Sequence, residues 1–516
     1  MNNTNDRVLF VQERIFNASG IINYGMAVVA TVVNKNYKVK AIDNNSQYVI
    51  YSKEDILDII EDFDPAVICF SLNTFNALRS YKTIEAIKEN YNDIPIIAGG
   101  IHVSNEYKEV LQYKVDFAVR GEAELIINQL IDEVVSGNNL DEMKGNLNIQ
   151  GVSYIQNDKL VDGGICPLPM DIDDYSFVDY NLYNFEDFIK TKNSKNLLPL
   201  MTQRCCPFRC SFCSDQFGRA RVRYRSIESS LRNIEYLYKE FNISIINIVD
   251  ADFTLSERRV IEFCRAIIEK GLNDKIKFVI QTHSFSLIKK DVLRLMKKSG
   301  FNTISFGIER LNGEIQKKIG KPLKKEIIVS NISGASKVGF ITQVNYLIGF
   351  NFENEKLIEQ ENKYFMELFD KGVDVISVSI LSPMPGTEEY ESQRSKLEGW
   401  YLNPVLLETF RPLYLIVKNL IYDPFLVNVY SFNHRLIRKL ILTKILFRSE
   451  SIKKKSYFLY LIYQLLLFAS FFSEKFYRSN MKFVEQAIFG KFHALVWQTK
   501  VNLALYWAKG EKTFRG

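Results

Sequence analysis

Histidine and cysteine are both scarce in this chain, which has four histidines and seven cysteines among 516 residues. The histidines lie far apart and offer no His pair of the kind that completes common zinc sites. So few cysteines, with no apolar N-terminal segment, argue against a secreted protein held by disulfides. We therefore expect reduced thiols and a cytoplasmic protein. Disorder is excluded as well, because 47% of the residues are hydrophobic and 13% are aromatic.

The positive charge of the chain is concentrated towards the C-terminus, and residues 1–400 have a net charge of −6. The net charge is +6, yet residues 401–516 alone have 18 Lys and Arg against 6 Asp and Glu. Long aliphatic and aromatic stretches separate these basic residues, a pattern that argues against nucleic-acid binding. We expect a helical, basic and aromatic C-terminal domain over residues 396–516.

The nearly uncharged run 457–472 lies within this basic region. It is interrupted by Gln464 and is shorter than the roughly 20 residues that span a bilayer. Three interpretations stay open: a buried helix, a lid over the substrate, and a helix in the membrane interface that would make the protein peripheral to a membrane.

Residues 1–140 alternate short runs of Val, Ile and Ala with segments of helix length. Continuous apolar strands separated by helices predict a parallel, doubly wound α/β sheet that is covered on both faces. Ligands on such sheets bind beyond the carboxyl ends of the strands. Residues 141–195 contain a hairpin pattern and a stretch rich in Pro and Asp, and we expect them to form a connector.

A second series of strands and helices occupies residues 196–395. Its six apolar strands, with helix-length segments between them, predict a partial (β/α)6 barrel of the TIM type. The chemistry of such a barrel gathers at the carboxyl ends of its strands. The segment TQRCCPFRCSFC (202–213) follows the first strand, where functional residues are therefore expected.

Four of the seven cysteines lie in this one segment, and Cys206, Cys210 and Cys213 have the spacing C-x3-C-x2-C. Three thiolates on a short loop can ligate three irons of a [4Fe-4S] cluster and leave the fourth iron open. A zinc site is the alternative, but the sequence supplies neither a second C-x2-C motif nor a His pair for it. The spacing thus predicts a cluster with these cysteines as ligands.

CPFRCSFC resembles the cluster loop of the radical S-adenosylmethionine (SAM) superfamily, and TQRC is similar to the family's TxRGC, with Cys205 where glycine is usual. The resemblance covers residues 195–390 and implies that SAM is cleaved at the open iron to a 5′-deoxyadenosyl radical. VDADFTL, FGIER and SPMPGT are similar to further family segments. The SAM-binding residues that these likenesses imply are Phe212, Asp250, Asp252, Glu309, Pro383 and Gly386. After Ile348 the chain reads GFNFENE instead of GxPGE, which indicates a loop remodelled around a different substrate.

IPIIAGGIHVS (94–104) and VDFAVRGEAE (115–124) are similar to the Rossmann-like cobalamin-binding domain of B12-dependent radical enzymes. The cobalamin contacts that this resemblance implies are Ser71, Leu72, Gly99, Gly100, His102, Gly121 and Glu122. The loop QERIFNASG lacks the histidine of the D-x-H-x-x-G motif, so no histidine of this loop can be the lower axial ligand. A sheet that merely packs on the barrel remains the alternative for this domain.

These resemblances together imply a cobalamin-dependent radical SAM enzyme that methylates an unactivated carbon atom through methylcobalamin. Its cofactors would be a [4Fe-4S] cluster, SAM and cobalamin. The expected partners are a small-molecule, lipid-like or peptide substrate and an electron donor such as flavodoxin or ferredoxin. Two alternatives stay open: a radical cyclase or rearrangement enzyme without methyl transfer, and a non-catalytic protein that binds cobalamin or a cluster.

Overall fold

The computed structural model describes most of residues 6–402. The undescribed positions in this range are 16–21, 46–48, 138, 176, 185–196, 215–220, 286, 322, 349, 351, 353–356, 358–359, 362–363, 365–366, 369 and 398. The predictions for residues 403–516, including the run 457–472, lie outside the described residues. Within the described part, no helix combines the length and the apolar character needed to cross a membrane.

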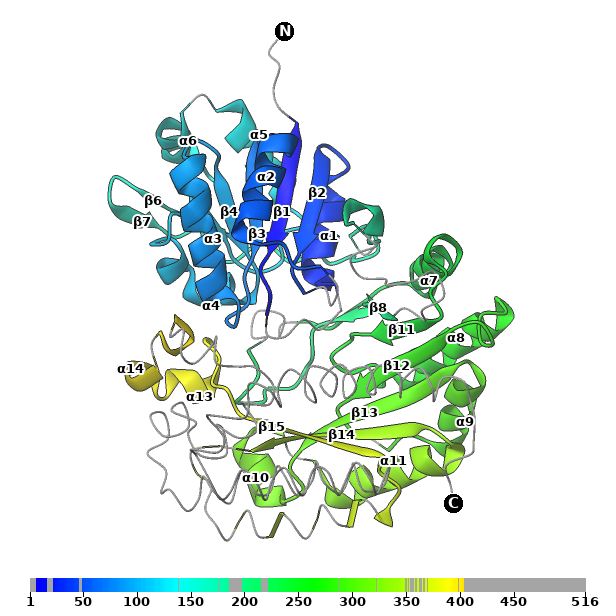
Figure 1. Cartoon of the computed structure of the whole chain (residues 1–516). Helices are drawn as coiled ribbons and strands as arrows, with labels where there is room; N and C mark the ends of the chain where they lie inside the picture. Colours follow the sequence, from blue (N-terminus) through cyan, green and yellow to red (C-terminus); the bar gives the residue numbers. More distant parts are fainter. Residues whose placement is uncertain are drawn as a thin grey trace, which may run out of the picture.

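The N-terminal sheet has seven strands in the order β2-β1-β3-β4-β5-β6-β7 (Figure 1). They are β1 (Arg7–Gln12), β2 (Lys38–Asp43), β3 (Val67–Ser71), β4 (Ile96–Gly99), β5 (Phe117–Val119), β6 (Val152–Gln156) and β7 (Lys159–Val161). The first five run parallel, whereas β6 and β7 are antiparallel. The hairpin that the sequence placed in the connector therefore forms an edge of this sheet.

Helices cover both faces of this sheet, as the continuous apolar strands predict. Within β1, Val8 and Phe10 pack into one apolar cluster and Leu9 and Val11 into the other. The covering helices are α1 (Tyr24–Val33), α5 (Ile127–Ser136) and α6 (Leu140–Asn146) on the first face, and α2 (Lys53–Phe63), α3 (Ala77–Asn90) and α4 (Ile101–Val110) on the second. The doubly wound, Rossmann-like prediction is confirmed.

The second sheet has six parallel strands that follow the chain, with β8 and β15 at its two edges. The strands are β8 (Leu197–Leu200), β11 (Ile245–Ile248), β12 (Lys277–Thr282), β13 (Phe301–Glu309), β14 (Ile341–Ile348) and β15 (Val375–Ile380). The helices between them include α7 (Ile227–Phe241), α8 (Glu257–Glu269), α9 (Lys290–Lys298), α10 (Gly313–Lys318) and α11 (Lys325–Val338). This arrangement confirms the predicted partial barrel.

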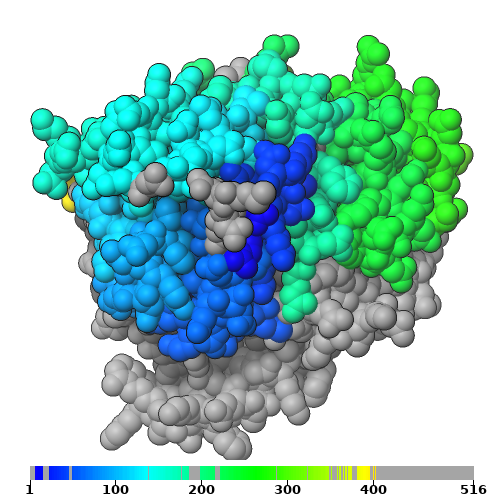
Figure 2. Space-filling view, turned by 90° about the horizontal axis from the view of Figure 1, so that it is seen from above, coloured from blue at the N-terminus to red at the C-terminus, as the bar shows by residue number. Residues whose placement is uncertain are grey.

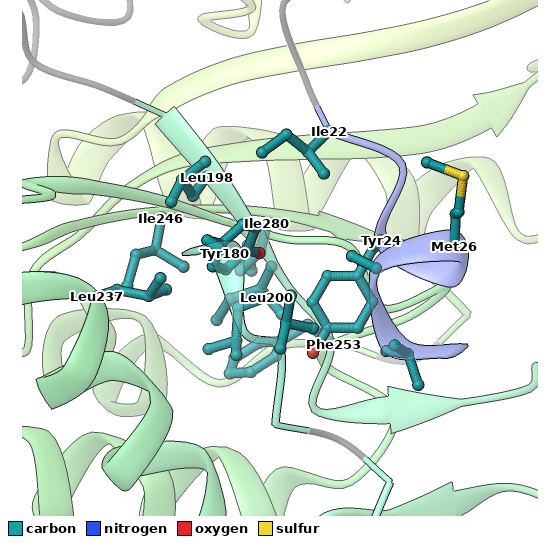
Figure 3. Close-up of a cluster of buried hydrophobic side chains, with 14 of the residues drawn as sticks. Ile22, Tyr24, Met26, Tyr180, Leu198, Leu200, Leu237, Ile246, Phe253 and Ile280 are labelled. Carbon is teal, nitrogen blue, oxygen red and sulfur yellow. The ribbon is translucent and has the colours of Figure 1, made fainter. Parts of the chain in front are cut away.

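The two sheets belong to units that pack directly against each other, as Figure 2 shows for the blue-to-cyan and green surfaces. One apolar cluster runs from the start of α1 into β8 and β11, and Figure 3 shows Tyr24 beside Leu200 and Phe253 in it. The connector joins the same cluster through Tyr180, whose hydroxyl donates to the Pro199 carbonyl at 3.0 Å. This apolar packing orients the two units so that the carboxyl ends of the strands in both sheets face the same space.

A glycine brings two turns of the N-terminal sheet into contact. Gly100, between β4 and α4, has φ +108°, and a Cβ built on it would lie 2.5 Å from the Leu72 carbonyl oxygen. That oxygen also accepts a hydrogen bond from the His102 backbone N–H at 3.2 Å. Only glycine allows both the positive φ and this approach of one backbone to another.

Replacing Gly100 with Ala should destabilise the fold by about 1–3 kcal/mol from the backbone conformation alone, with the clash added to it. Gly313→Ala is the matched control, because a Cβ there meets nothing within 4 Å. Urea denaturation followed by circular dichroism measures both variants. Equal stabilities for the two would contradict this account of the turn.

Candidate functional site

The cysteine-rich loop is closed at its base by a short antiparallel ladder. β9 (Gln203–Arg204) pairs with β10 (Arg223–Tyr224), so that Arg204 lies opposite Arg223. Within the loop, the Cys213 backbone N–H donates to the Cys210 carbonyl at 3.1 Å. Cys210 is buried, and Cys206 and Cys213 are half-buried. The three predicted cluster ligands thus lie on one loop, although in the described residues no three His, Cys, Asp or Glu side chains are arranged to hold a metal ion.

Two later segments of the chain hold the far side of this loop. The Ser211 N–H donates to the Ile319 carbonyl at 3.0 Å, and Gly320, with φ +67°, lies against the Arg209 carbonyl. Ser211 also contacts the start of α13 (Glu388–Glu391): its carbonyl accepts from the Glu388 N–H at 3.0 Å, and its hydroxyl donates to Glu389 at 3.1 Å. The loop is therefore fixed by strands on one side and by helix ends on the other.

The buried ammonium group of Lys321 lies beside the cysteines. Burial raises the pKa of the Cys206 and Cys210 thiols, to about 11 for Cys210, and the Lys321 charge partly opposes that rise. The Lys321 Nζ atom is 3.2 Å from the Glu309 carboxylate, and its side chain is only 5% exposed. Glu309 itself has φ +55° at a register shift of β13, which turns its side chain out of the strand pattern.

His283, which looked isolated in the sequence, contacts the cysteine loop. Its Nε2 atom is 3.9 Å from the Cys210 Sγ atom, and its ring stacks on Phe208 with centroids 3.8 Å apart. Burial, together with the charge of Lys321, lowers the pKa of this imidazole to about 3, so it is neutral at ordinary pH. Its Nδ1 atom is buried and has no hydrogen-bond partner among the described residues.

Asp250 follows β11 and holds the start of the cysteine loop. Its carboxylate accepts from the Thr202 N–H at 2.6 Å, the Thr202 hydroxyl at 2.5 Å and the Gln203 N–H at 2.9 Å. The side chain is buried, and burial raises the pKa of Asp250 to about 6 against the opposing effect of these bonds. Its oxygens are thus engaged by the protein itself, although the sequence pattern had pointed to SAM.

Asp252 is a second carboxylate in the turn after β11. Its carboxylate accepts hydrogen bonds from the Thr254 backbone at 3.2 Å and from the Thr282 hydroxyl at 3.2 Å. Burial raises the pKa of the Cys206 thiol, and the negative charge of Asp252 adds to that rise. Asp252 therefore remains beside the site that the cysteines define.

Of the other residues predicted to bind SAM, Phe212 belongs to the loop itself, and Pro383 and Gly386 lie between β15 and α13. Phe212 contacts Phe350 with ring centroids 6.1 Å apart, in a small apolar cluster with α10. Pro383 is buried in the segment after β15. Gly386 has φ +82° and lies against Asn105 of α4, so this segment reaches the N-terminal unit.

A cavity of about 470 Å³ lies between the two sheets, at the carboxyl ends of the N-terminal strands. Its lining includes six of the seven residues that the sequence predicts to bind cobalamin: Ser71, Leu72, Gly99, Gly100, Gly121 and Glu122. The second unit contributes to the same lining through Met201, Gln203, Arg204, Cys205, Val249 and Ala251. The cavity therefore reaches the residue that precedes the first predicted cluster ligand.

His102, the seventh predicted cobalamin contact, is fully buried and does not line this cavity. Its Nδ1 atom is 3.3 Å from the Thr74 hydroxyl, and its Nε2 atom is 3.2 Å from the Tyr81 hydroxyl. Its ring also meets the edge of Tyr401, with centroids 4.9 Å apart. These contacts place His102 in the packing between α3, α4 and the segment that follows the barrel.

Glu122 lines the cavity, but its carboxylate is engaged by two guanidinium groups. Arg204 donates to it at 2.6 Å and Arg223 at 2.5 Å and 2.9 Å. Burial alone would raise the pKa of Glu122, yet these bonds outweigh burial and lower it. This pairing could not be predicted from the sequence, because Glu122 and Arg223 lie 101 positions apart.

Asp250→Asn should preserve the cysteine loop, because an amide oxygen can still accept from the Thr202 and Gln203 N–H groups. Asp250→Ala should destabilise the chain by about 1–3 kcal/mol for each buried donor left without a partner. The iron content after anaerobic reconstitution should be near that of the wild type in the Asn variant and lower in the Ala variant. Wild-type iron content and stability in Asp250→Ala would contradict the role of Asp250 in holding the start of the cysteine loop.

The pH dependence of the same carboxyl group has a definite sign. Between the ~3.9 of an unfolded Asp and about 6, the folded chain keeps a proton that the unfolded chain has released. The stability of the wild type relative to Asp250→Asn should therefore fall as pH rises through this window and stay level above it.

Two protein families match the two units of the chain. Residues 18–131 match the B12 binding domain family, and residues 200–364 match the radical SAM superfamily. An uncharacterised methyltransferase of Pyrococcus horikoshii is 30% identical over 372 residues, which cover 71% of this chain and 77% of that protein.

Two more distant relatives have names that differ in the reaction. The anaerobic magnesium-protoporphyrin IX monomethyl ester cyclase of Cereibacter sphaeroides is 24% identical, over 69% of this chain and 57% of its own length. The hopanoid C-3 methylase of Methylococcus capsulatus is also 24% identical, over 67% of this chain and 64% of its own length.

A solved structure shares the fold. The methyltransferase TsrM of Kitasatospora setae, determined with cobalamin and a [4Fe-4S] cluster bound, superposes with a TM-score of 0.63 at 18% identity, over 76% of this chain and 78% of TsrM. The match to both families, the 30% identity to one relative and the fold lead to one conclusion: this chain belongs to the cobalamin-dependent radical SAM enzymes.

Proposed function

We propose that this enzyme transfers a methyl group to an unactivated carbon atom of a small-molecule, lipid-like or peptide substrate. The observation that carries the proposal is that the cavity and the cysteine loop are continuous, since Cys205 lines the cavity and Cys206 follows it. When bound, the cluster supplies the electron that cleaves SAM to a 5′-deoxyadenosyl radical, and cobalamin supplies the methyl group. The names of the methylase and methyltransferase relatives support this reaction.

The lining of the cavity fits cobalamin. Gly99, Gly100 and Gly121 expose backbone at the carboxyl ends of β4 and β5, where a flat ligand can approach closely. Among the described residues, Glu124 Oε2 is a buried acceptor without a hydrogen-bond partner in the same lining. Corrin side chains carry amide donors, and we propose that one of them bonds to Glu124.

The donor set of the loop fits an iron–sulfur cluster. Cys206, Cys210 and Cys213 are three thiols on one loop, and their ligation requires deprotonation. Because burial raises the pKa of Cys206 and Cys210, binding of iron should release protons, and the nearby ammonium of Lys321 favours the thiolate form.

We propose that Glu309, Asp252 and Lys321 bind the charged end of SAM. The two carboxylates can accept from its ammonium group, and Lys321 can pair with its carboxylate. All three side chains lie close to the cysteines or to one another. Phe212 stays our candidate for the contact with adenine, whereas we assign Asp250 to positioning.

A radical cyclisation without methyl transfer is the second candidate, and the relative named as a cyclase supports it. Cells that produce the enzyme can be fed methionine with a deuterated methyl group. A product that gains the labelled methyl supports methyl transfer. A product that loses hydrogen without gaining the label supports the cyclase.

Replacement of Cys206, Cys210 and Cys213 by Ala should abolish iron binding and the formation of 5′-deoxyadenosine, because no thiolate ligand remains. Cys264→Ala is the matched control, since Cys264 is a buried thiol in α8 away from the loop. Anaerobic reconstitution followed by iron analysis and chromatography measures both variants. Deoxyadenosine formation by the triple variant would overturn the assignment.

His283→Phe should lower the reduction potential of the cluster. Phenylalanine keeps a ring for stacking on Phe208 but removes Nε2, which donates to the Cys210 sulfur in the tautomer that is protonated at Nε2, and a hydrogen bond to a ligand sulfur favours the reduced state. A redox titration followed by electron paramagnetic resonance (EPR) measures the potential. The donor-keeping variant His283→Gln is the control. An unchanged potential in His283→Phe with full iron content would contradict this role.

A further inference from the structure

A buried ion cluster joins the two units at the edge of the cavity. Glu122 and Glu124 come from the segment after β5, and Arg204 and Arg223 come from the paired strands β9 and β10. Arg204 bonds to Glu122 at 2.6 Å and to Glu124 at 2.7 Å, while Arg223 bonds to Glu122 at 2.5 Å. Two glutamates from the turn after β5 thus bind the two strands that close the cysteine loop.

The four charged side chains are largely buried, and each charge is stabilised by its oppositely charged partners. The exposed fraction of the side chain is 9% for Arg204, 2% for Arg223, 5% for Glu124 and 23% for Glu122. A buried charge that loses its partner is strongly unfavourable. The segment after β5 therefore cannot shift relative to the base of the loop without leaving charges unpaired, so the cluster fixes the position of one unit on the other.

Arg223 extends this connection to the first residue of the loop. One guanidinium nitrogen donates to the Pro169 carbonyl at 2.9 Å, and the other lies 3.0 Å from the Cys205 Sγ atom. Cys205 has φ +71°, a conformation that favours glycine, so its thiol is held in place at a backbone cost. Cys206, the first predicted ligand, comes next in the chain.

We propose that Glu122, Arg223 and Cys205 form a positioning chain that sets where the cysteine loop stands relative to the cobalamin cavity. Glu122 is then a positioning residue, whereas the sequence resemblance implied that it contacts cobalamin. The proposal rests on the proposed function, because both cofactors must occupy these places. The position of the loop relative to the cavity affects the reaction, because a displacement of about 1 Å between reacting groups can lower the rate about 10²-fold.

The test is Glu122→Gln in the chain reconstituted with cobalamin and iron. An amide keeps the size of the side chain but cannot hold two guanidinium groups by charge. The expected result is wild-type content of both cofactors, with a weakened and broadened spin–spin coupling between the reduced cluster and cob(II)alamin in the EPR spectrum. Cys205→Gly, which relaxes the backbone but removes the thiol, should change the coupling in the same direction.

Glu106→Gln is the matched control. Glu106 on α4 forms a two-bond ion pair with Arg394 of α14 (Arg394–Leu397), at 2.9 Å and 2.7 Å, which also joins the two units but lies outside the cavity lining. This variant should keep the wild-type coupling. An unchanged coupling in Glu122→Gln, or a loss of cobalamin affinity with wild-type coupling in the loaded fraction, would overturn the proposal.

Hydrogen exchange of the cofactor-free chain separates this proposal from the proposed function. Glu122→Gln should speed amide exchange at residues 203–213 and 223–224, and Glu106→Gln should not. Equal exchange in the two variants would overturn the positioning chain, whatever the cofactors do. Failure of the wild type to bind either cofactor would instead overturn the proposed function and leave the exchange result to decide the positioning chain.

Discussion

The site depends on how a loop that carries three thiols is held in place. Asp250 accepts three hydrogen bonds at the start of the loop, and the β9–β10 ladder closes its base. The backbone contact with Ile319 and the start of α13 hold its far side. Because these contacts already order the backbone of the loop, the binding of a cofactor there should need less free energy to order the chain.

The same constraint links the two units. Parallel sheets present their functional edge at the carboxyl ends of the strands, and here the two edges face one cavity. Apolar packing around Tyr24 and Leu200 brings the units together, and the buried ion pairs of Glu122 and Glu124 fix the position of one unit relative to the other. Apolar burial has no preferred direction and stabilises the contact between the units. The hydrogen-bonded charge pairs are directional and determine how the units are oriented.

Local patterns in the sequence were sufficient to predict the architecture. Continuous apolar strands predicted both sheets, because a strand buried on two faces needs no polar alternation. The spacing of Cys206, Cys210 and Cys213 puts three thiols on one short loop, and their role as cluster ligands stays a prediction. The glycines at 99 and 100 likewise marked a turn that lines the cavity.

The directions of individual side chains could not be predicted from such patterns. Asp250 and His102 both occur in segments that resemble cofactor-binding motifs. In the structure, however, their polar atoms form hydrogen bonds with other residues of the protein. Lys321 and His283 carried no local signal, because each reaches the cysteine loop from a distant strand connection.

The central claim is that three thiolates of one loop leave one iron of a four-iron cluster open to SAM. Mössbauer spectroscopy of the anaerobic protein reconstituted with 57Fe, with and without SAM, tests it most directly. The account predicts that addition of SAM changes the isomer shift of one iron in four. Four irons that are unaffected by SAM, or a zinc ion in place of the cluster, would contradict it.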